Sequence, residues 1–350
     1  MRVRWLVAGL ILAACNPTAT VTPTPTVGPT ISPTARTTAA PTAAPSPTAT
    51  TSPAPSATAS EWHAGPSLPR PRAEFGAAVA DERLYVVGGF DAIQPGEWLT
   101  EVDVYDATTD SWLAAAPLPE GRDHPAVAAF EGRVYVFGGT SPGVRDDALV
   151  YDPATDEWQA IAKMPARRAQ AAAVTVGDHI YLFGGVTPAG PGGAALDTWA
   201  YDPTSDTWQD DLAPIPTQRN HLMAVLLDGR AWVIGGRWDL NVNAVESYDP
   251  ATDTWHTERP LPVATSGATA AVHDGLIHVT GGEDLATFAT VDEHQVYDFF
   301  GAAWNLEEPL PIGRHGLASG FLGELWYVVG GGPAADYSAS TQVDIWAPAP

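Results

Sequence analysis

The stretch Leu84-Tyr85-Val86-Val87-Gly88-Gly89 decides the fold, because its pattern recurs throughout the chain. Four apolar residues rich in β-branched and aromatic side chains, ended by two glycines, predict a buried strand that stops at a tight bend. Gly-Gly doublets of this kind recur at intervals of 46 to 51 residues. They are Gly88-Gly89, Gly138-Gly139, Gly184-Gly185, Gly235-Gly236, Gly281-Gly282 and Gly330-Gly331. A repeat of this length is one supersecondary unit that buries its apolar faces only against its neighbours.

Two further features keep register with the doublets. Upstream of each doublet, a second apolar run ends at a turn pair such as Glu131-Gly132 or Asp228-Gly229, whose preference for positive φ suits a hairpin. Downstream, a Tyr is followed seven residues later by a Trp, as in Tyr105 and Trp112, across a polar turn segment. Each unit therefore predicts four antiparallel strands, named a to d in chain order, and shows no helical periodicity.

The apolar run, the doublet and the spaced Tyr and Trp together resemble the kelch repeat over residues 61–350, which hold all six units. Kelch repeats form β-propellers, in which four-stranded blades surround a channel, so the resemblance implies an all-β, six-bladed propeller. The last unit reaches Trp346 without a strand d, whereas Trp62 stands seven residues before Pro69, as Trp112 does before Pro119. We therefore expect the N-terminal strand to complete the last blade and close the ring, which removes open sheet edges.

The chain before the repeats has a different composition. Residues 1–15 place Arg2 and Arg4 before a short apolar core and end in Leu12-Ala13-Ala14-Cys15, which predicts a secretory signal peptide and resembles the bacterial lipobox. The resemblance implies that Cys15 is lipidated and becomes the mature N-terminus; an ordinary signal with a chance Cys is the alternative. Residues 16–60 hold 14 Thr, 10 Pro, 10 Ala and 5 Ser, which predicts a disordered tether between the signal peptide (1–15) and the propeller (61–350).

Nearly all of the charge lies in the propeller. All 41 acidic residues lie at or after Glu61 with 14 of the 17 basic ones, so this part has a net charge of −27 with neutral His. Such an acidic domain is repelled by nucleic acid and by anionic lipid headgroups. We therefore expect a monomeric, extracytoplasmic protein of the bacterial cell envelope that meets the membrane only through Cys15. Because Cys15 is the single cysteine, no disulfide forms within the chain.

Spacing separates the scaffold from its variable parts. The Pro that opens each unit stands 19 residues before the doublet in every unit, whereas the distance from the doublet to the next Tyr (Trp346 in the last unit) varies from 12 to 16 residues. This variation falls in the loop between strands b and c, and loops on a rigid scaffold often carry binding sites. An Arg stands three residues after the opening Pro in every unit but the fifth, which has Thr265. These residues are Arg72, Arg122, Arg168, Arg219 and Arg314.

Two roles are open for the five arginines. Guanidinium groups gathered around one channel mouth would bind a carboxylate or a sulfate; alternatively, each Arg braces its neighbour blade through carboxylates or carbonyls. The kelch resemblance implies either role, since Arg recurs at this position and contacts acidic peptides in some members. His124, His221 and His315 follow these arginines closely but lack close metal-ligand spacing. We expect them to line the channel, and we expect no metal and no other cofactor.

Trp98 and Trp238 stand outside the repeat, in b–c loops. Trp238 belongs to Arg237-Trp238-Asp239, directly after a doublet, and an indole beside a guanidinium and a carboxylate suits sugar stacking or peptide anchoring. Packing at the loop tips is the alternative. The fifth unit also replaces the aromatic residue of strand b by His278 and follows its doublet with Glu283-Asp284. These changes would make one side of the channel mouth acidic, unless they reflect drift.

The resemblance leaves two classes of function open. Galactose-oxidase-like kelch enzymes need copper and a Tyr–Cys crosslink, which the single Cys at position 15 excludes. Secreted bacterial sialic-acid mutarotases (N-acetylneuraminate epimerases) are also six-bladed kelch proteins and provide the enzymatic alternative. The sequence offers no nucleophile–base pair, phosphate loop or metal-ligand motif for assigning catalytic residues. We therefore expect a non-catalytic lipoprotein whose loop face and channel mouth bind a protein or an acidic glycan.

Overall fold

The computed structural model describes residues 60–93, 96–189, 195–335 and 337–348. By its contacts the chain divides into Met1–Ala54 and Pro55–Pro350, and the described residues all belong to the second unit. The predicted signal peptide, the lipid anchor at Cys15 and the tether up to residue 59 lie outside them. Among the residues described, no helix has the length and apolar character that crossing a membrane would require.

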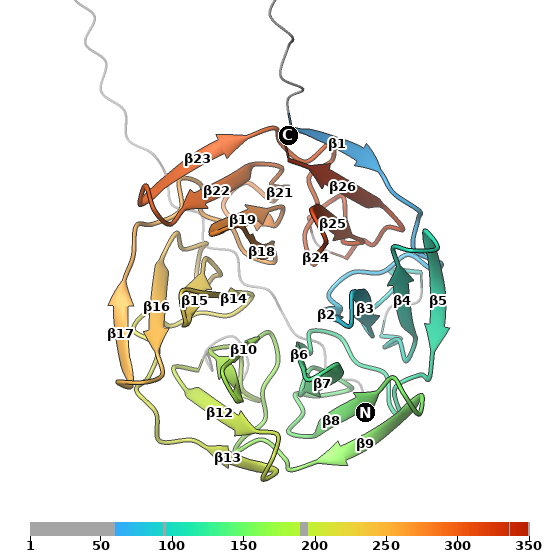
Figure 1. The fold of residues 1–350 in the computed structure, drawn as a ribbon, viewed down its shortest axis with the longest axis vertical. Helices are drawn as coiled ribbons and strands as arrows, with labels where there is room; N and C mark the ends of the chain where they lie inside the picture. Colours follow the sequence, from blue (N-terminus) through green and yellow to red (C-terminus); the bar gives the residue numbers. More distant parts are fainter. Residues whose placement is uncertain (1–59, 94–95, 190–194, 336, 349–350) are drawn as a thin grey trace, which may run out of the picture. The chain divides into compact units, whose positions relative to one another are not determined.

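Six four-stranded antiparallel sheets account for the blades in the described part of the chain, and they stand radially around a common centre (Figure 1). The predicted all-β, six-bladed propeller is confirmed. Blade 1 comprises β2 (Gly76–Ala80), β3 (Arg83–Val87), β4 (Val102–Asp106) and β5 (Ser111–Ala115). Blade 2 comprises β6 (Ala126–Phe130), β7 (Arg133–Phe137), β8 (Ala148–Asp152) and β9 (Glu157–Ile161). Blade 3 comprises β10 (Ala172–Val176), β11 (His179–Phe183), β12 (Thr198–Asp202) and β13 (Thr207–Gln209). Blade 4 comprises β14 (Met223–Leu227), β15 (Arg230–Ile234), β16 (Val245–Asp249) and β17 (Thr254–Thr257). Blade 5 comprises β18 (Thr269–His273), β19 (Leu276–Thr280), β22 (His294–Asp298) and β23 (Ala303–Glu307). Blade 6 comprises β24 (Ala318–Leu322), β25 (Leu325–Val329), β26 (Val343–Ala347) and β1 (Glu61–Ala64).

The two ends of the propeller meet in blade 6. Strand β1 pairs with β26 in antiparallel register, with Trp62 opposite Trp346. The Trp62 indole Nε1–H donates to the carbonyl of Glu308 in the preceding blade at 2.8 Å. The strand-d tryptophans of the other blades make the same bond at 2.8 to 3.0 Å. They are Trp112, Trp158, Trp208, Trp255 and Trp304. The predicted closure by the N-terminal strand is therefore confirmed.

The doublets fasten each blade to the next. Gly88 and Gly89 have φ of 69° and 91°, and a Cβ on Gly88 would lie 2.5 Å from the carbonyl oxygen of Arg122, so only glycine fits there. The Gly89 N–H donates to that same carbonyl at 2.8 Å. Equivalent bonds join every doublet to the following blade, and the bond from Gly331 to Arg72 at 2.9 Å closes the circle.

The hydrophobic core lies between blades. Leu84 and Val86 of blade 1, for example, pack with Tyr327 and Val329 of blade 6 in one buried cluster. Strands b and c supply most of the fully buried side chains, because they occupy the middle of each sheet and contact neighbours on both faces. Burial between rigid sheets fixes the positions of the loops that the sheets carry.

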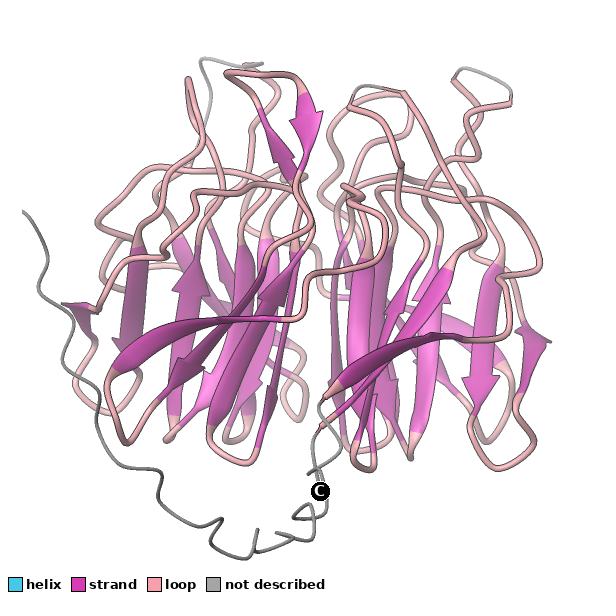
Figure 2. Cartoon of the chain, turned by 90° about the horizontal axis from the view of Figure 1, so that it is seen from above, coloured by secondary structure: helices cyan, strands magenta, loops and turns pink. Residues whose placement is uncertain are grey.

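The propeller has two unlike faces. Up-and-down strand order places the a–b and c–d turns on one face, here called the hairpin face, and the b–c loops with the d–a connections on the other, here called the loop face. Figure 2 shows longer loops rising from one face, while short turns close the other. In blade 5 the b–c loop forms a small hairpin of its own, β20 (Glu283–Asp284) with β21 (Ala289–Thr290).

Candidate functional site

One cavity is lined by six residues that stand two positions after the strand-a arginines, or after Thr265 in blade 5. They are Glu74, His124, Gln170, His221, Gly267 and Gly316. All six have positive φ, between 49° and 62°. Such a conformation is uncommon outside glycine and persists only where the surrounding structure holds it. We call these six residues the neck ring.

Backbone hydrogen bonds close the neck ring. The N–H of each member donates to the carbonyl of the member in the preceding blade, at distances of 2.6 to 3.1 Å. The Glu74 N–H completes the circle with the carbonyl of Gly316 at 2.8 Å. Because every blade contributes one donor and one acceptor, the ring holds its side chains at fixed positions around the channel. Four members carry polar side chains, and the two glycines leave the remaining arc without any.

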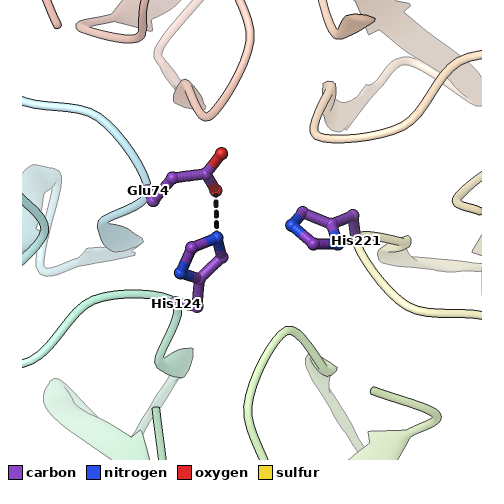
Figure 3. A group of neighbouring side chains, drawn as sticks. All are labelled: Glu74, His124 and His221. Atoms are coloured by element: carbon purple, nitrogen blue, oxygen red, sulfur yellow. Dashed lines mark ion pairs between the residues drawn. The ribbon is translucent and has the colours of Figure 1, made fainter. Parts of the chain in front are cut away.

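Three of these side chains converge in the channel. Glu74, His124 and His221 come from blades 1, 2 and 4 and point toward one another (Figure 3), with their possible ligand atoms all within 4.8 Å of each other. The His124 Nε2 lies 3.0 Å from the Glu74 Oε2, and the two imidazole rings meet edge-on at 5.1 Å. The cluster lines a cavity of about 140 Å³.

The residues that precede the two histidines orient their rings. The Asp123 Oδ1 lies 3.0 Å from the His124 Nδ1, and the Asn220 Oδ1 lies 2.6 Å from the His221 Nδ1. The Asn220 amide oxygen accepts a hydrogen bond from the Nδ1–H of His221. The Nε2 of His221 therefore carries the free lone pair of the ring. That lone pair accepts a hydrogen bond from the Arg237 guanidinium at 3.0 Å.

The local charges set the protonation of the cluster. Burial alone would raise the pKa of Glu74, but the charge and the hydrogen bond of His124 outweigh burial and lower it. Burial disfavours the charged form of His124, yet Glu74 and Asp123 raise its pKa to about 10. Burial and the Arg237 charge hold the pKa of His221 well below its ordinary value. At neutral pH a charged Glu74–His124 pair therefore faces a neutral imidazole.

A groove of about 380 Å³ opens beside the neck ring on the loop face, where it is lined by Arg237, Trp238, Asn220 and His221 together with loop residues of blades 2 and 3. The Arg237 guanidinium also pairs with the buried carboxylate of Glu283 from blade 5. One of the two acids expected to make the mouth acidic is therefore neutralised by a neighbouring blade. Of the predicted triplet, Arg237 and Trp238 line the groove, and Asp239 is exposed beside it.

Trp98 lies apart from that groove, in the b–c loop of blade 1. Its indole Nε1–H donates to the Asp123 Oδ2 at 3.2 Å. The Asp123 carboxylate is thus held between Trp98 and His124. The structure therefore does not bring Trp98 and Trp238 together, but it connects Trp98 to the neck ring.

The five strand-a arginines lie inside the blades rather than on the channel mouth, with guanidinium side chains 0 to 3% exposed. Each pairs with a carboxylate of its own blade. The pairs are Arg72–Asp103, Arg122–Asp147, Arg168–Asp197, Arg219–Glu246 and Arg314–Asp344. Burial lowers the pKa of every one of these arginines, and the facing carboxylate opposes that shift. These contacts fit a bracing role, but within the blade rather than toward its neighbour, and they leave no exposed guanidinium there for a ligand.

No sequence motif pointed to Glu74, Gln170, Asn220 or Asp123 as functional residues. The signal that would have found the neck ring is the constant offset of two residues from the strand-a arginine. His315 stands only one residue after Arg314, so it falls outside the ring. Its side chain is buried, with Nδ1 3.2 Å from the carbonyl of Gly332.

Comparisons with known proteins agree with this architecture. A family model described as the KLHDC2/KLHL20/DRC7 Kelch-repeats domain matches residues 50–185 and 117–282, which together make up more than half of the chain. Human kelch-like protein 33 is 32% identical over 86 residues, 24% of this chain and 16% of that protein. Beta-scruin of Limulus polyphemus is 36% identical over 87 residues, 24% of this chain and 9% of that protein. The chain thus spans less than a fifth of the length of these curated relatives.

A solved structure, "Structure of YjhT", superimposes with a TM-score of 0.70 and covers 80% of this chain and 95% of that one. The two sequences are 18% identical over the match. A likeness at that level of identity supports the arrangement of the blades. It says nothing of what the channel or the loop face binds.

Proposed function

Because the chain belongs to the kelch-repeat family of β-propellers, whose fold supports a binding or scaffold role, we propose that it is a binding protein whose loop face and channel mouth hold a ligand. In this proposal it is lipid-anchored through Cys15 at the outer side of a bacterial membrane, and the tether carries the propeller outward. The ligand is a protein, with an acidic glycan as the second candidate. The protein works as a monomer and without catalysis.

The observation that carries the proposal is that large apolar side chains are exposed on the loop face. Ile93, Leu240 and Phe288 stand in three different b–c loops and are 70%, 58% and 76% exposed. Large exposed apolar side chains on the same face as a groove with an indole and a guanidinium are typical of protein-binding surfaces. Arg237 is already paired with Glu283, which weakens the case for a free sugar carboxylate as ligand and favours a protein.

A matched pair of phenylalanines tests the proposal. Phe288 on the loop face and Phe300 on the hairpin face are 76% and 86% exposed. A photo-reactive phenylalanine analogue is placed at either position of the full-length protein in intact cells. We expect a discrete crosslinked partner from position 288 only. An excess of the same protein without the analogue should reduce the amount of this crosslinked product. Equal crosslinking from both positions, or from position 300 alone, would contradict a loop-face site.

The lipid anchor has a separate test, because it does not depend on the ligand. Metabolic labelling with a palmitate analogue should mark the wild-type protein and leave Cys15→Ser unlabelled. The variant should also move from the membrane fraction to the soluble envelope fraction. An unlabelled wild-type protein would show that the signal is an ordinary secretory one.

A sugar-active enzyme resembling sialic-acid mutarotase is the alternative function. The Glu74–His124 pair in a cavity open to the channel is the observation that favours it, since a carboxylate beside an imidazole can exchange protons with a sugar hydroxyl. Anomeric exchange of sialic acid followed by NMR distinguishes the two functions. A rate equal to that in buffer excludes the enzyme, whereas acceleration that Glu74→Gln abolishes would replace the binding proposal.

A further inference from the structure

We propose that Glu74, His124 and His221 form a binding site for a divalent transition-metal ion at the neck ring. Two imidazole nitrogens and one carboxylate oxygen lie within 4.8 Å of one another. This donor set suits Zn²⁺ and its neighbours in the first transition row, whose ligands are His nitrogen and carboxylate oxygen. The inference goes beyond the proposed function, because it requires no ligand in the groove.

The arrangement behind the histidines is independent support. Histidines that bind a metal commonly donate their second ring N–H to a carboxylate or another oxygen, which fixes the ring and directs the free nitrogen at the ion. His124 makes this contact with Asp123 at 3.0 Å, and His221 makes it with Asn220 at 2.6 Å. Both Nε2 atoms therefore face the channel, and Trp98 in turn holds Asp123 in place.

The neck ring itself supplies rigidity and space. Six hydrogen bonds in a closed circle fix the three backbones that carry the ligands, and strained backbone of this kind is often found at binding sites. Gly267 and Gly316 add no side chain of their own, and the Glu74 carboxylate lies against Gly316, where a Cβ would come within 2.7 Å of it. The cavity of about 140 Å³ exceeds the roughly 30 Å³ that one water occupies, so a metal-bound water has room in it.

Two present contacts compete with the ion. The Nε2 of His124 faces the Glu74 carboxylate as an ion pair, and the Nε2 of His221 accepts from Arg237. Metal binding requires His124 to lose one proton to solvent and requires Arg237 to leave His221. The Arg237 guanidinium keeps its pair with Glu283 when it does so. Removal of this competitor should therefore strengthen metal binding.

The test is calorimetric titration of Zn²⁺ into untagged, metal-free full-length protein. We expect one site that Glu74→Gln, His124→Ala or His221→Ala weakens by at least about 10-fold, the smallest loss usual for changes around a metal site. Asp123→Ala should weaken it by about 10-fold or more, whereas Arg237→Gln should tighten it. The matched control is His273→Ala, since His273, Asp274 and Glu324 form a second possible trio on the hairpin face.

The titration can overturn the proposal in two ways. One is the absence of a Zn²⁺ site, or a site that only His273→Ala removes. The other is unchanged affinity in all three neck variants. Because a neck variant can fail to fold, X-ray absorption of the Zn²⁺-loaded wild-type protein gives a second measurement. It should show two imidazole ligands, and a zinc shell of oxygens alone would reject the site. These experiments use the metal alone, so their failure would leave the proposed binding function untouched.

Discussion

Blade 4 holds a buried ion pair at the position where blade 5 holds two neutral side chains. The Arg219 Nη1 lies 2.7 Å from the Glu246 Oε2, and both side chains are almost fully buried. In blade 5 the same positions are occupied by Thr265, which donates to the Gly281 carbonyl at 2.8 Å, and by Gln295, which bonds both backbone groups of Val263. The guanidinium and the carboxylate are lost together. This coupling indicates that the pair acts as one structural brace.

Blade 5 departs from the other blades in two further places. His278 replaces the aromatic residue of strand b and lies against His294, with the His278 Nδ1 3.0 Å from the His294 Nε2. In the c–d turn, Ala302 stands where blades 1 to 4 have an Asp that accepts from a Tyr hydroxyl. Blade 5 therefore differs from the other blades in an ion pair, a buried pair of titratable side chains and a turn hydrogen bond. Each difference is expected to affect stability by a different amount.

The largest effect is expected from breaking the brace in blade 4. Arg219→Ala leaves the Glu246 carboxylate buried and without its guanidinium, which should cost about 3 to 5 kcal/mol of unfolding free energy. Urea unfolding followed by tryptophan fluorescence measures the loss. Binding at the loop face should change little at temperatures where the variant stays folded.

The control for the brace copies blade 5 into blade 4. The double variant Arg219→Thr with Glu246→Gln removes both charges and offers the neutral pair that blade 5 uses. We expect it to recover at least half of the stability lost by Arg219→Ala. If the double variant is as unstable as the single one, or less stable, the two charges do not act as one unit and the comparison fails.

An intermediate effect is expected from acid. Burial, together with the neighbouring His294 and His273, lowers the pKa of His278 to about 3, and burial lowers the pKa of His294 to about 4. As pH falls below about 6.5, these two imidazoles bind protons in the unfolded chain but stay neutral in the folded chain. The free energy of unfolding therefore decreases between that pH and about 3. The loss amounts to about 1.4 kcal/mol per pKa unit of difference.

The variant His278→Phe restores an aromatic ring of the kind that the other blades carry and isolates this contribution. Its melting temperature should fall less steeply than that of the wild type between pH 6.5 and pH 4, in thermal scans at matched ionic strength. His221 contributes a loss of the same sign in both proteins, so the difference between the two slopes is the informative quantity. Parallel slopes would assign the acid sensitivity to groups other than His278.

The sequence was sufficient for the fold but not for the site. Doublets, turn pairs and strand-d tryptophans report local geometry, and local geometry repeated six times specifies the ring. The burial of the arginines could not be predicted, because their acidic partners stand at different distances along the chain, from 25 residues for Asp147 to 31 for Asp103. Glu74, His124 and His221 belong to different blades, and only the closed ring brings them together. His315 stands one residue after Arg314 and not two, so it is not a member of the neck ring.

The smallest predicted effect is a gain of stability in blade 5. In blade 4 the Asp253 Oδ1 accepts from the Tyr248 hydroxyl at 2.7 Å and from the Ala213 N–H at 2.8 Å. Ala302 occupies the equivalent position in blade 5 with the same kind of backbone, φ 47° against 51° for Asp253. Ala302→Asp should therefore bond Tyr297 and raise the unfolding free energy by about 1 kcal/mol, measured by urea unfolding.

Two controls distinguish the new hydrogen bond from relief of backbone strain at position 302. Ala302→Gly relaxes the positive φ without supplying an acceptor, so it should gain less than Ala302→Asp. Adding Tyr297→Phe to Ala302→Asp removes the donor and should cancel most of the gain, which a double-mutant cycle measures directly. If Ala302→Gly stabilises as much as Ala302→Asp does, the turns of blades 1 to 4 owe their Asp to backbone conformation and not to the Tyr hydroxyl. The c–d turn of blade 5 would then differ from those turns in backbone strain alone.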